Sequence, residues 1–331
     1  MKIKFFLLIA LTSMFWGCDD RSQEQKLTDR ALEIHQKVFT VDSHTDTPLW
    51  FARQDFDLSR RHDPHDHGSR VDFPRMKEGG LDGVFFAVFL GQRQRNDSAN
   101  RQAFERAEMI FDSVYATVER HPELAAIARS PEEAFKLEKQ GKRAVFIGIE
   151  NGYAIGKDLS LIEHFYNRGA RYITLCHSAN NDICDSSTDT TEHNGLSNFG
   201  EDVVREMNRL GMMIDVSHIS DSSFYDVLAL STSPVIASHS SARAVCDSPR
   251  NLTDDMLEKL AGNGGVAQVC ILSDYVKEMP PNAQRDSARN VLREKYRNFE
   301  NLTDEEMKQA DNGMNLWTRF VIPAGVYPGI D

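Results

Sequence analysis

Short apolar runs alternate with segments of helical periodicity along most of the chain. Runs rich in apolar and β-branched residues predict seven strands: Val38–Ser43, Gly83–Leu90, Ala144–Ile149, Arg171–Cys176, Met212–Ser217, Val235–Ser238 and Val266–Leu272. Between them, apolar residues recur at helical spacing in Leu161–Asn167, Glu201–Leu210 and Asp254–Ala261. Gly211 is placed to end the second of these helices, and Thr253 to begin the third. Strands that alternate with helices form parallel units, so the pattern predicts an α/β fold, a TIM-like (β/α)8 barrel.

The last part of the chain does not supply the eighth strand that such a barrel needs. From Asn282 through Gln309 the sequence is polar and helix-prone. The remainder is interrupted by Pro323 and Pro328, and proline is rare inside strands. We therefore expect residues 31–275 to form the barrel without its eighth strand, and residues 276–331 to form a divergent helical or irregular tail.

Composition narrows the range of partners. A chain of 331 residues with a hydrophobic fraction of 40% is within the size range of one barrel domain. Its formal net charge of −12 argues against a nucleic-acid partner, because binding a phosphate backbone requires clustered Lys and Arg. The acidic balance says little about the substrate.

The beginning of the chain has the pattern of an export signal. Two lysines flank the start of the apolar stretch Phe5–Trp16, which is too short to span a membrane. The pair Gly17 and Cys18 resembles a bacterial lipobox, although the two residues before it are bulky where small ones are usual. We expect residues 1–18 to be a lipoprotein-type signal peptide and residues 19–30 to be a polar tether. The protein would then be exported and anchored to a membrane by lipid on Cys18, at the periplasmic or cell-surface face.

The remaining cysteines would lie in an exported chain, where a disulfide is permitted. They are Cys176, Cys184, Cys246 and Cys270, and the sequence cannot choose among their three pairings. No CxxC pair occurs, which argues against a thiolate zinc cluster. We expect buried free thiols.

Metal-capable side chains stand at the ends of the predicted strands. His44 and Asp46 follow the first strand and, being two residues apart, can face the same side. Glu150 ends the apolar run AVFIGIE, where a carboxylate can ligate one metal ion or bridge two. His218 and His239 close the runs MMIDVSH and PVIASHS. Each of these residues has an ordinary structural explanation as a hydrogen-bonding group. Five of them at one face of a barrel favour a zinc site, because imidazole and carboxylate both suit zinc.

Other polar residues allow two interpretations each. His177 closes the run RYITLCH and could be a structural group or a functional one. Arg250 could grip a substrate carboxylate through its planar fork, or be an ordinary surface arginine. His62, His65 and His67 have the appearance of a metal box, but their Pro- and Gly-containing segment predicts a solvated loop.

Longer motifs resemble the membrane dipeptidase family, that is, renal dipeptidase and its bacterial relatives. The matching segments occur in the family's order: VDSHTDTP, RVDFPRMKEGGLDGVFFAVF, GIENG, RYITLCHSAN, GLSNFGEDVVREMNRLGMMIDVSHIS and PVIASHSSARAVCDSPRN. The resemblance implies a metallo-dependent hydrolase barrel with two zinc ions. In the family pattern His44 and Asp46 would hold one ion, His218 and His239 the other, and Glu150 would bridge them.

The resemblance also implies a reaction, the zinc-dependent hydrolysis of dipeptides by a metal-bridging hydroxide. His177 matches the family histidine that helps to bind substrate and to stabilise the tetrahedral intermediate, so His177 and Glu150 are the candidate catalytic residues. Arg250 matches the arginine that takes the C-terminal carboxylate of the dipeptide. Two departures follow the bridging position: Asn151 stands where glycine is usual, and Tyr153 where histidine often stands. We expect them to alter the pocket without touching the ligands.

A further departure concerns the end of the chain. Family members continue to an eighth strand that ends in a proton-transfer aspartate within a GSDFDG-like motif. This sequence has no such motif, and Asp331 has no matching context. We expect impaired hydrolysis, because general acid–base catalysis is typically worth about 10²–10⁴-fold in rate.

Two alternatives to a dipeptidase stay open on the sequence. One is a non-catalytic lipoprotein that binds a metal or a peptide, and the other is a different amidohydrolase-type activity that uses the same metals. The expected partners are a dipeptide substrate and, through Cys18, a membrane. A homodimer is also allowed, whereas no nucleic acid is expected.

Overall fold

The computed structural model describes residues 21–51, 56–63 and 69–278, together with residues 287, 290, 291, 294 and 295. Two compact units make up the chain, Met1–Val38 and Phe39–Asp331. In the first unit, helix α1 (Gln23–His35) begins with a capping box between Ser22 and Gln25 and has no buried residue. Much of the segment predicted to be a polar tether is therefore helical.

Cys18 and the expected signal peptide lie outside the described residues. No helix in the described part of the chain is long and apolar enough to cross a membrane.

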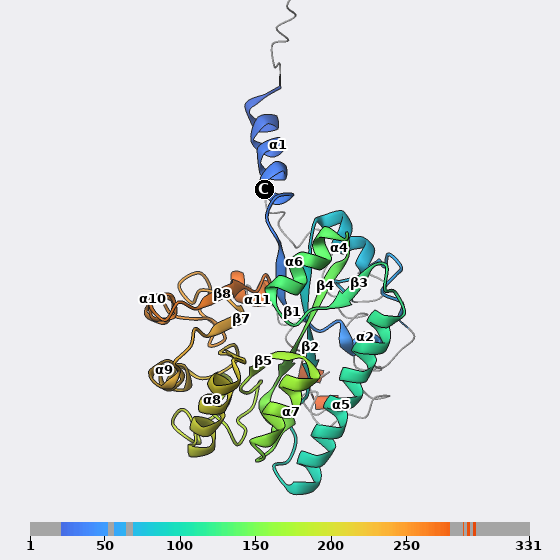
Figure 1. Cartoon of the computed structure of the whole chain (residues 1–331). Helices are drawn as coiled ribbons and strands as arrows, with labels where there is room; N and C mark the ends of the chain where they lie inside the picture. Colours follow the sequence, from blue (N-terminus) through green and yellow to red (C-terminus); the bar gives the residue numbers. More distant parts are fainter. Residues whose placement is uncertain are drawn as a thin grey trace, which may run out of the picture. The chain divides into compact units, whose positions relative to one another are not determined.

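The second unit is built on parallel strands. Their order is β1 (Val41–Thr45), β2 (Gly83–Phe89), β4 (Arg143–Glu150), β5 (Ala170–Thr174), β6 (Met213–Asp215), β7 (Ile236–Ser240) and β8 (Val266–Val269). These are the seven predicted strands, and they form a nearly closed barrel, which confirms the TIM-like fold class (Figure 1).

Strands β1 and β8 are the two ends of this path, and within the described residues no strand ladder joins them. Hydrogen bonds that involve side chains link β1 to β8 and to β7 instead. The backbone N–H of Ser43 donates to the Gln268 side chain at 3.2 Å, and the Ser43 hydroxyl donates to the carbonyl of Ser238 on β7.

The sequence pattern missed one strand and placed several strand ends up to three residues away from those observed. Strand β3 (Ala125–Ile127) pairs with β4, and its three residues are too few to show a periodicity. The predicted ends before His44 and His239 are wrong, because β1 includes His44 and β7 includes His239. Backbone pairing with the neighbouring strands, which the apolar run does not report, carries the extended conformation past the last apolar residue.

Helices lie around the strands (Figure 1). The predicted helices are confirmed as α7 (Ser160–Arg168), α8 (Asn198–Leu210) and α10 (Asp254–Gly262). Gly211 caps α8 in the left-handed conformation, with φ of 72°, and the Thr253 hydroxyl accepts the N–H of Met256 at the start of α10. The other helices whose bounds are described in this unit are α2 (Pro48–Phe51), α4 (Phe73–Gly79), α5 (Asp97–Glu119), α6 (Pro131–Lys139), η1 (Gly152–Ile155), α9 (Asp221–Leu230) and α11 (Ser273–Val276).

The core lies between the strands and these helices. Helix α8 buries Val203, Val204 and Met207, which are spaced as one face of a helix requires. Strand β4 is buried from Ala144 to Glu150, as expected for a central strand covered on both sides. A carboxylate at the end of such a strand is therefore held in a rigid position.

Three of the four cysteines of this unit, Cys176, Cys184 and Cys246, are buried. Cys270 is partly buried, and all four are free thiols.

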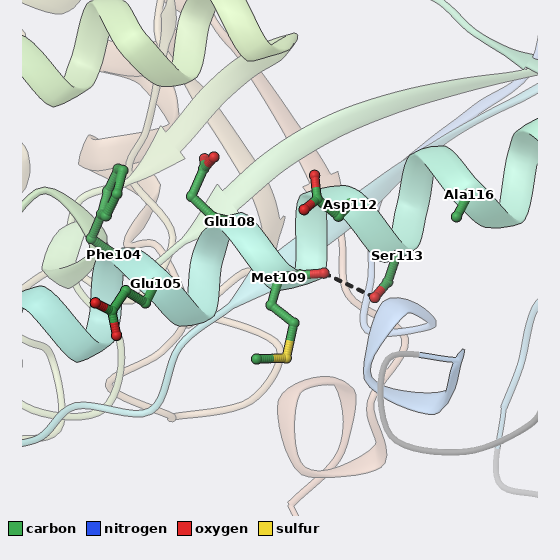
Figure 2. Close-up of a pocket in the computed structure, with 7 residues that line it drawn as sticks. All are labelled: Phe104, Glu105, Glu108, Met109, Asp112, Ser113 and Ala116. Atoms are coloured by element: carbon green, nitrogen blue, oxygen red, sulfur yellow. Dashed lines mark hydrogen bonds between the residues drawn. The ribbon is translucent and has the colours of Figure 1, made fainter.

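A surface depression of about 570 Å³ lies along one face of α5 (Figure 2). Phe104 and Met109 give it apolar surface, and Glu105, Glu108 and Asp112 make it acidic. No metal-capable strand-end residue lines it, so this depression is separate from the candidate site.

Candidate metal centre

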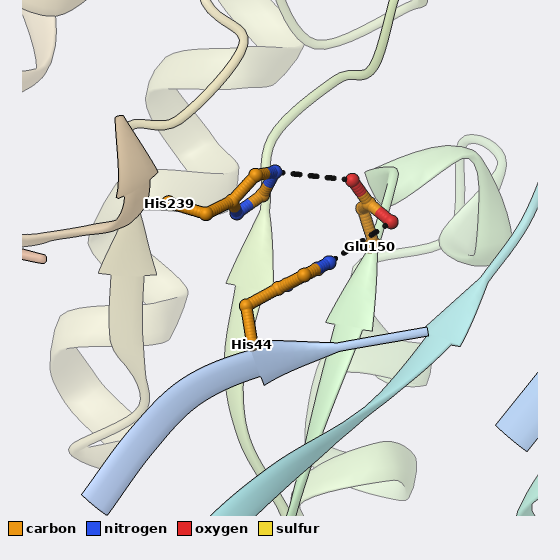
Figure 3. Close-up of side chains that lie close together, drawn as sticks. All are labelled: His44, Glu150 and His239. Carbon is orange, nitrogen blue, oxygen red and sulfur yellow. Dashed lines mark ion pairs between the residues drawn. The ribbon is translucent and has the colours of Figure 1, made fainter. Parts of the chain in front are cut away.

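Histidines from several strand ends converge on Glu150, the last residue of β4. His44 of β1 and His239 of β7 both point toward it, and their rings stack with centroids 3.8 Å apart (Figure 3). The Nε2 atoms of His218 and His239 lie 3.1 and 3.3 Å from Glu150 Oε1, whereas Nε2 of His44 lies 3.4 Å from Oε2. The two oxygens of one buried carboxylate therefore face different histidines.

Asp46 and His177 lie at the edge of this cluster. Asp46 Oδ1 is 3.7 Å from His44 Nε2, and the Asp46 side chain is 56% exposed. His177 Nε2 is 3.7 Å from Glu150 Oε1, and its ring centroid is 4.2 Å from that of His218. The sequence pattern alone did not bring His177 into the same cluster, but the structure does.

The ligand atoms can be grouped in more than one way. Within 4.8 Å of one another lie His44, Glu150 and His239, and likewise Glu150, His177 and His218. The shortest separation in the cluster, however, is 2.8 Å between Nε2 of His218 and Nε2 of His239. This separation is that of a hydrogen bond between the two imidazoles, and both nitrogens also lie close to Glu150 Oε1.

Backbone strain accompanies the site. His218 has φ of 73°, a left-handed conformation that costs a residue with a Cβ about 1–2 kcal/mol. Its carbonyl accepts the N–H of Ser187 at 2.8 Å, which ties this residue to the loop after β5. Strain of this kind persists where surrounding structure enforces it, and it is common at functional sites.

The two departures from the family motif have structural explanations. Asn151 has φ of 80°, so the position favours glycine, and asparagine is among the side chains that best tolerate it. Its side chain bonds four groups, including the Leu90 carbonyl at 2.9 Å and the Tyr153 N–H at 3.1 Å. The Tyr153 hydroxyl donates to the Gln94 carbonyl at 2.7 Å. Both residues therefore support the loop after β2 rather than reaching a metal-capable atom.

The electrostatics of the cluster are dominated by burial and by Glu150. Burial alone would raise the pKa of Glu150, but His44, His218 and His239 outweigh it and hold that pKa well below its usual value. Burial alone would lower the pKa of His44, but Tyr172, Glu150 and Asp46 raise it well above the usual value. These contacts favour the charged forms of Glu150 and His44, and a metal ion bound at Nε2 of His44 would replace the proton on that nitrogen.

The other three imidazoles favour the neutral form. Burial lowers the pKa of His218 well below its usual value, and Arg250 and His177 add to the effect. Burial also lowers the pKa values of His239 and His177, with partial opposition from Glu150. Neutral imidazole is the form that binds metal, so these groups are ready to act as ligands near neutral pH.

Arg250 is buried beside the cluster rather than placed on the surface. It is 6% exposed, and one terminal N–H donates to the carbonyl of His239 at 3.1 Å. The guanidinium carbon lies 5.3 Å from the ring of Tyr275. Its Nε is buried and has no hydrogen-bond partner within the described structure.

Of the three histidines in the expected metal box, His62 is described, and it lies apart from the metal centre. The His62 backbone N–H donates to the Asp72 carboxylate at 2.9 Å, and its ring stacks on Phe56 with centroids 4.1 Å apart. His65 and His67 lie outside the described residues.

Sequence reasoning missed three residues next to the ligands, namely Tyr172, Asp215 and Ser238. Tyr172 contacts His44, and Ser238 contacts both His239 and Asp215. Asp215 could have been noticed, because an aspartate within the apolar run MMIDV is unusual. Tyr172 and Ser238 have no comparable signal, because both are ordinary residues in a strand.

The donor chemistry of the cluster fits a divalent metal ion. Imidazole nitrogen and carboxylate oxygen are the ligands of zinc and of related transition metals. The histidines His44, His218 and His239 supply the nitrogens, and Glu150, with Asp46 at the edge, supplies the oxygens.

The sequence of this chain is similar to those of known dipeptidases. Residues 28–311 match the family described as membrane dipeptidase (peptidase family M19). Dipeptidase verJ of Clonostachys rogersoniana is 34% identical over 267 residues, which cover 77% of this chain and 68% of that protein. Dipeptidase 3 of Mus musculus is 34% identical over 257 residues, which cover 75% of this chain and 50% of that protein. The chain thus spans about half the length of the mouse protein.

A solved structure has a similar fold. It is a metallopeptidase from Rhodobacter sphaeroides liganded with a phosphinate mimic of the dipeptide L-Ala-D-Ala, with a TM-score of 0.64 and 25% identity. The match covers 84% of this chain and 83% of that one. Together with the match over residues 28–311, this likeness shows that the chain belongs to the membrane dipeptidase family, peptidase family M19.

Proposed function

We propose that the protein is a metal-dependent dipeptidase that uses two zinc ions bridged by Glu150. The observation that carries the proposal is the division of the two Glu150 oxygens between different histidines. Ligands about 2.0–2.1 Å from a tetrahedral zinc ion lie about 3.3 Å from one another. The separations of Glu150 Oε1 from His218 and His239, 3.1 and 3.3 Å, are close to that value.

The other oxygen, Oε2, would serve the second ion together with His44 and Asp46. His44 Nε2 lies 3.4 Å from Oε2 and 3.7 Å from Asp46 Oδ1. When bound, two such cations polarise the scissile carbonyl and supply hydroxide near neutral pH by lowering the pKa of a shared water.

The remaining proposed roles concern the substrate. His177 is 27% exposed in its side chain and lies beside Glu150, where it could donate a hydrogen bond to the oxyanion that develops on the scissile carbonyl. Arg250 is the proposed partner of the dipeptide's C-terminal carboxylate. Its buried, unpartnered Nε supports this role, since a buried N–H without an acceptor is costly unless a ligand completes it. A carboxylate held so close to the reacting centre would restrict substrates to short peptides.

The test is turnover and metal content measured on the same preparation. The purified chain is loaded with Zn²⁺, its zinc is counted by elemental analysis, and hydrolysis is followed for L-Ala-L-Ala, L-Ala-D-Ala and N-acetyl-alanine. We expect two zinc ions per chain and hydrolysis of dipeptides, with Glu150→Gln as the matched inactive control. A wild-type chain that binds no zinc, or that turns over no faster than the control, would contradict the proposal.

The same assay separates the alternatives. Peptide binding without hydrolysis would favour a non-catalytic binding protein, and preference for N-acetyl-alanine would favour another amidohydrolase-type activity.

We also propose export and lipid modification at Cys18, on the sequence pattern of residues 1–18 alone. The whole chain, expressed in a bacterial host, would then partition into the detergent phase of a phase-separating detergent. Cys18→Ala should move it to the aqueous phase, and equal partition of both would contradict the anchor.

A further inference from the structure

Beneath the metal-capable side chains, a tyrosine crosses the barrel interior. Tyr172 of β5 is fully buried, and its hydroxyl lies 3.0 Å from Nδ1 of His44 and 3.1 Å from the carbonyl oxygen of Ser43. Both contacts are on β1, which is not adjacent to β5 in the sheet. The ring therefore spans the interior to reach the far side.

A glycine on β4, a strand between β1 and β5, leaves room for the tyrosine ring to cross the interior. Gly148 of β4 is the register partner of Tyr172. A Cβ built on Gly148 would lie 2.1 Å from Cζ of Tyr172, far inside van der Waals contact. Any larger residue at this position would displace the ring, so the glycine is required by the tyrosine and not by backbone conformation.

The hydrogen-bond partners of Tyr172 determine whether its hydroxyl donates or accepts in each contact. The Ser43 carbonyl can only accept, so the Tyr172 hydroxyl donates its single proton there. The phenol oxygen is then free to accept from Nδ1–H of His44. When His44 is neutral, as a metal ligand must be, that tautomer leaves its Nε2 lone pair pointing at the site, 3.4 Å from Glu150 Oε2.

A second, independent set of hydrogen bonds determines the tautomer of His239. Ser238 Oγ lies 2.8 Å from Nδ1 of His239 and donates its proton to Asp215 Oδ2 at 2.6 Å. Asp215 is fully buried and also accepts from the Thr174 hydroxyl and from the backbone N–H groups of Ser217 and Ser238. With its proton committed to Asp215, the Ser238 oxygen accepts from Nδ1–H of His239.

His218 provides a contrast within the same cluster. Its Nδ1 is buried and has no hydrogen-bond partner in the described part of the chain. Hydrogen bonds from the barrel interior therefore reach Nδ1 of His44 and His239 but not Nδ1 of His218. Such a bond is not a general consequence of burying a histidine.

We propose that Tyr172 and Ser238 are positioning residues that fix the Nδ1–H tautomers of His44 and His239 and so aim both Nε2 atoms at the metals. The inference rests on the proposed function, since it concerns ligands of the ions assigned there. Partners of this kind, one step removed from the metal, typically change metal affinity by about 10–100-fold.

The test measures zinc affinity by competition with a chromophoric chelator, for the wild-type chain, Tyr172→Phe and Ser238→Ala. We expect each variant to bind Zn²⁺ about 10–100-fold more weakly. The matched controls are Tyr153→Phe, whose hydroxyl bonds the Gln94 carbonyl, and Ser240→Ala, a buried serine on the same strand as Ser238. Both controls lose a buried hydroxyl that does not touch an imidazole, so both should bind zinc within about threefold of wild type.

A second readout follows the imidazoles directly. In the zinc-loaded protein labelled with ¹⁵N-histidine, the Nδ1–H protons of His44 and His239 should be protected from exchange with solvent. Tyr172→Phe should remove the protection at His44 alone, and Ser238→Ala at His239 alone.

Wild-type affinity in both variants, or equal weakening in the controls, would overturn the inference while leaving the proposed function intact. A wild-type chain that binds no zinc would overturn both.

Discussion

Asn151 offers a sharp test of how the strand that carries Glu150 is held in place. The residue directly follows Glu150 and has φ of 80°. Its side chain donates to the Leu90 carbonyl and to the Gln92 side chain, and it accepts from the Tyr153 N–H and from Asn181. Two different variants separate the backbone contribution from the side-chain contribution.

Asn151→Gly removes only the side-chain hydrogen bonds, since glycine adopts a positive φ without steric cost. The N–H of Tyr153 and one N–H of the buried Asn181 side chain would lose their acceptor. Each buried donor left without a partner costs about 1–3 kcal/mol, so we expect the free energy of unfolding to fall by about 2–6 kcal/mol. Asn151→Ala has the same losses and also places a Cβ on a backbone of positive φ, which adds about 1 kcal/mol.

The assay is urea denaturation of the two variants and the wild type at pH 7.5 in the presence of a chelator, so that metal binding does not contribute. The order of stability should be wild type, then Asn151→Gly, then Asn151→Ala. A glycine variant as stable as wild type would refute the hydrogen-bond argument. Equal stabilities of the glycine and alanine variants would refute the argument from φ.

Four further predictions concern the metal centre and its surroundings. Glu150→Gln should weaken zinc binding by more than the roughly 10–100-fold typical of indirect partners, since it removes a proposed direct ligand; chelator competition measures this, and an unchanged affinity would rule Glu150 out as a ligand. Zinc at about 100 times its dissociation constant should stabilise the wild-type chain by about 2.7 kcal/mol and raise Tm by roughly 5–10 °C in calorimetry, whereas no shift would speak against a site in the folded state. Gly148→Ala should lower the free energy of unfolding by about 1–3 kcal/mol and also weaken zinc binding, because its Cβ would meet the Tyr172 ring; a neutral effect on both would show that the ring can move. Burial alone would raise the pKa of Asp185, but the backbone N–H groups of residues 192, 193 and 195 hold that pKa below its usual value. The ionised Asp185 therefore stabilises the fold above about pH 4, and this stabilisation is lost as pH falls through the lower folded pKa. The stability difference between wild type and Asp185→Asn should be large at pH 7 and shrink in acid, and a difference independent of pH would contradict this.

Several parts of the site could be predicted from the sequence because they are local. The apolar runs that end at Glu150, His218 and His239 predict the position of a strand and also the side chain that lies near its end. In a parallel barrel all strand ends of one kind meet at the same face, so listing the ends is nearly enough to list the cluster. The helix ends at Gly211 and Thr253 were predictable for the same reason, since capping depends on neighbouring residues only.

What only the tertiary structure decided depends on register between strands that are far apart in the chain. Tyr172 and Gly148 are ordinary residues in their own strands, and their relation appears only when β4 and β5 pair and the ring extends toward β1. Likewise, nothing local to Glu150 says which oxygen faces His44 and which faces His218. Periodicity records how one segment is buried, whereas hydrogen bonds across a barrel are set by the offset between strands, and the pattern of apolar and polar residues along the chain does not contain that offset.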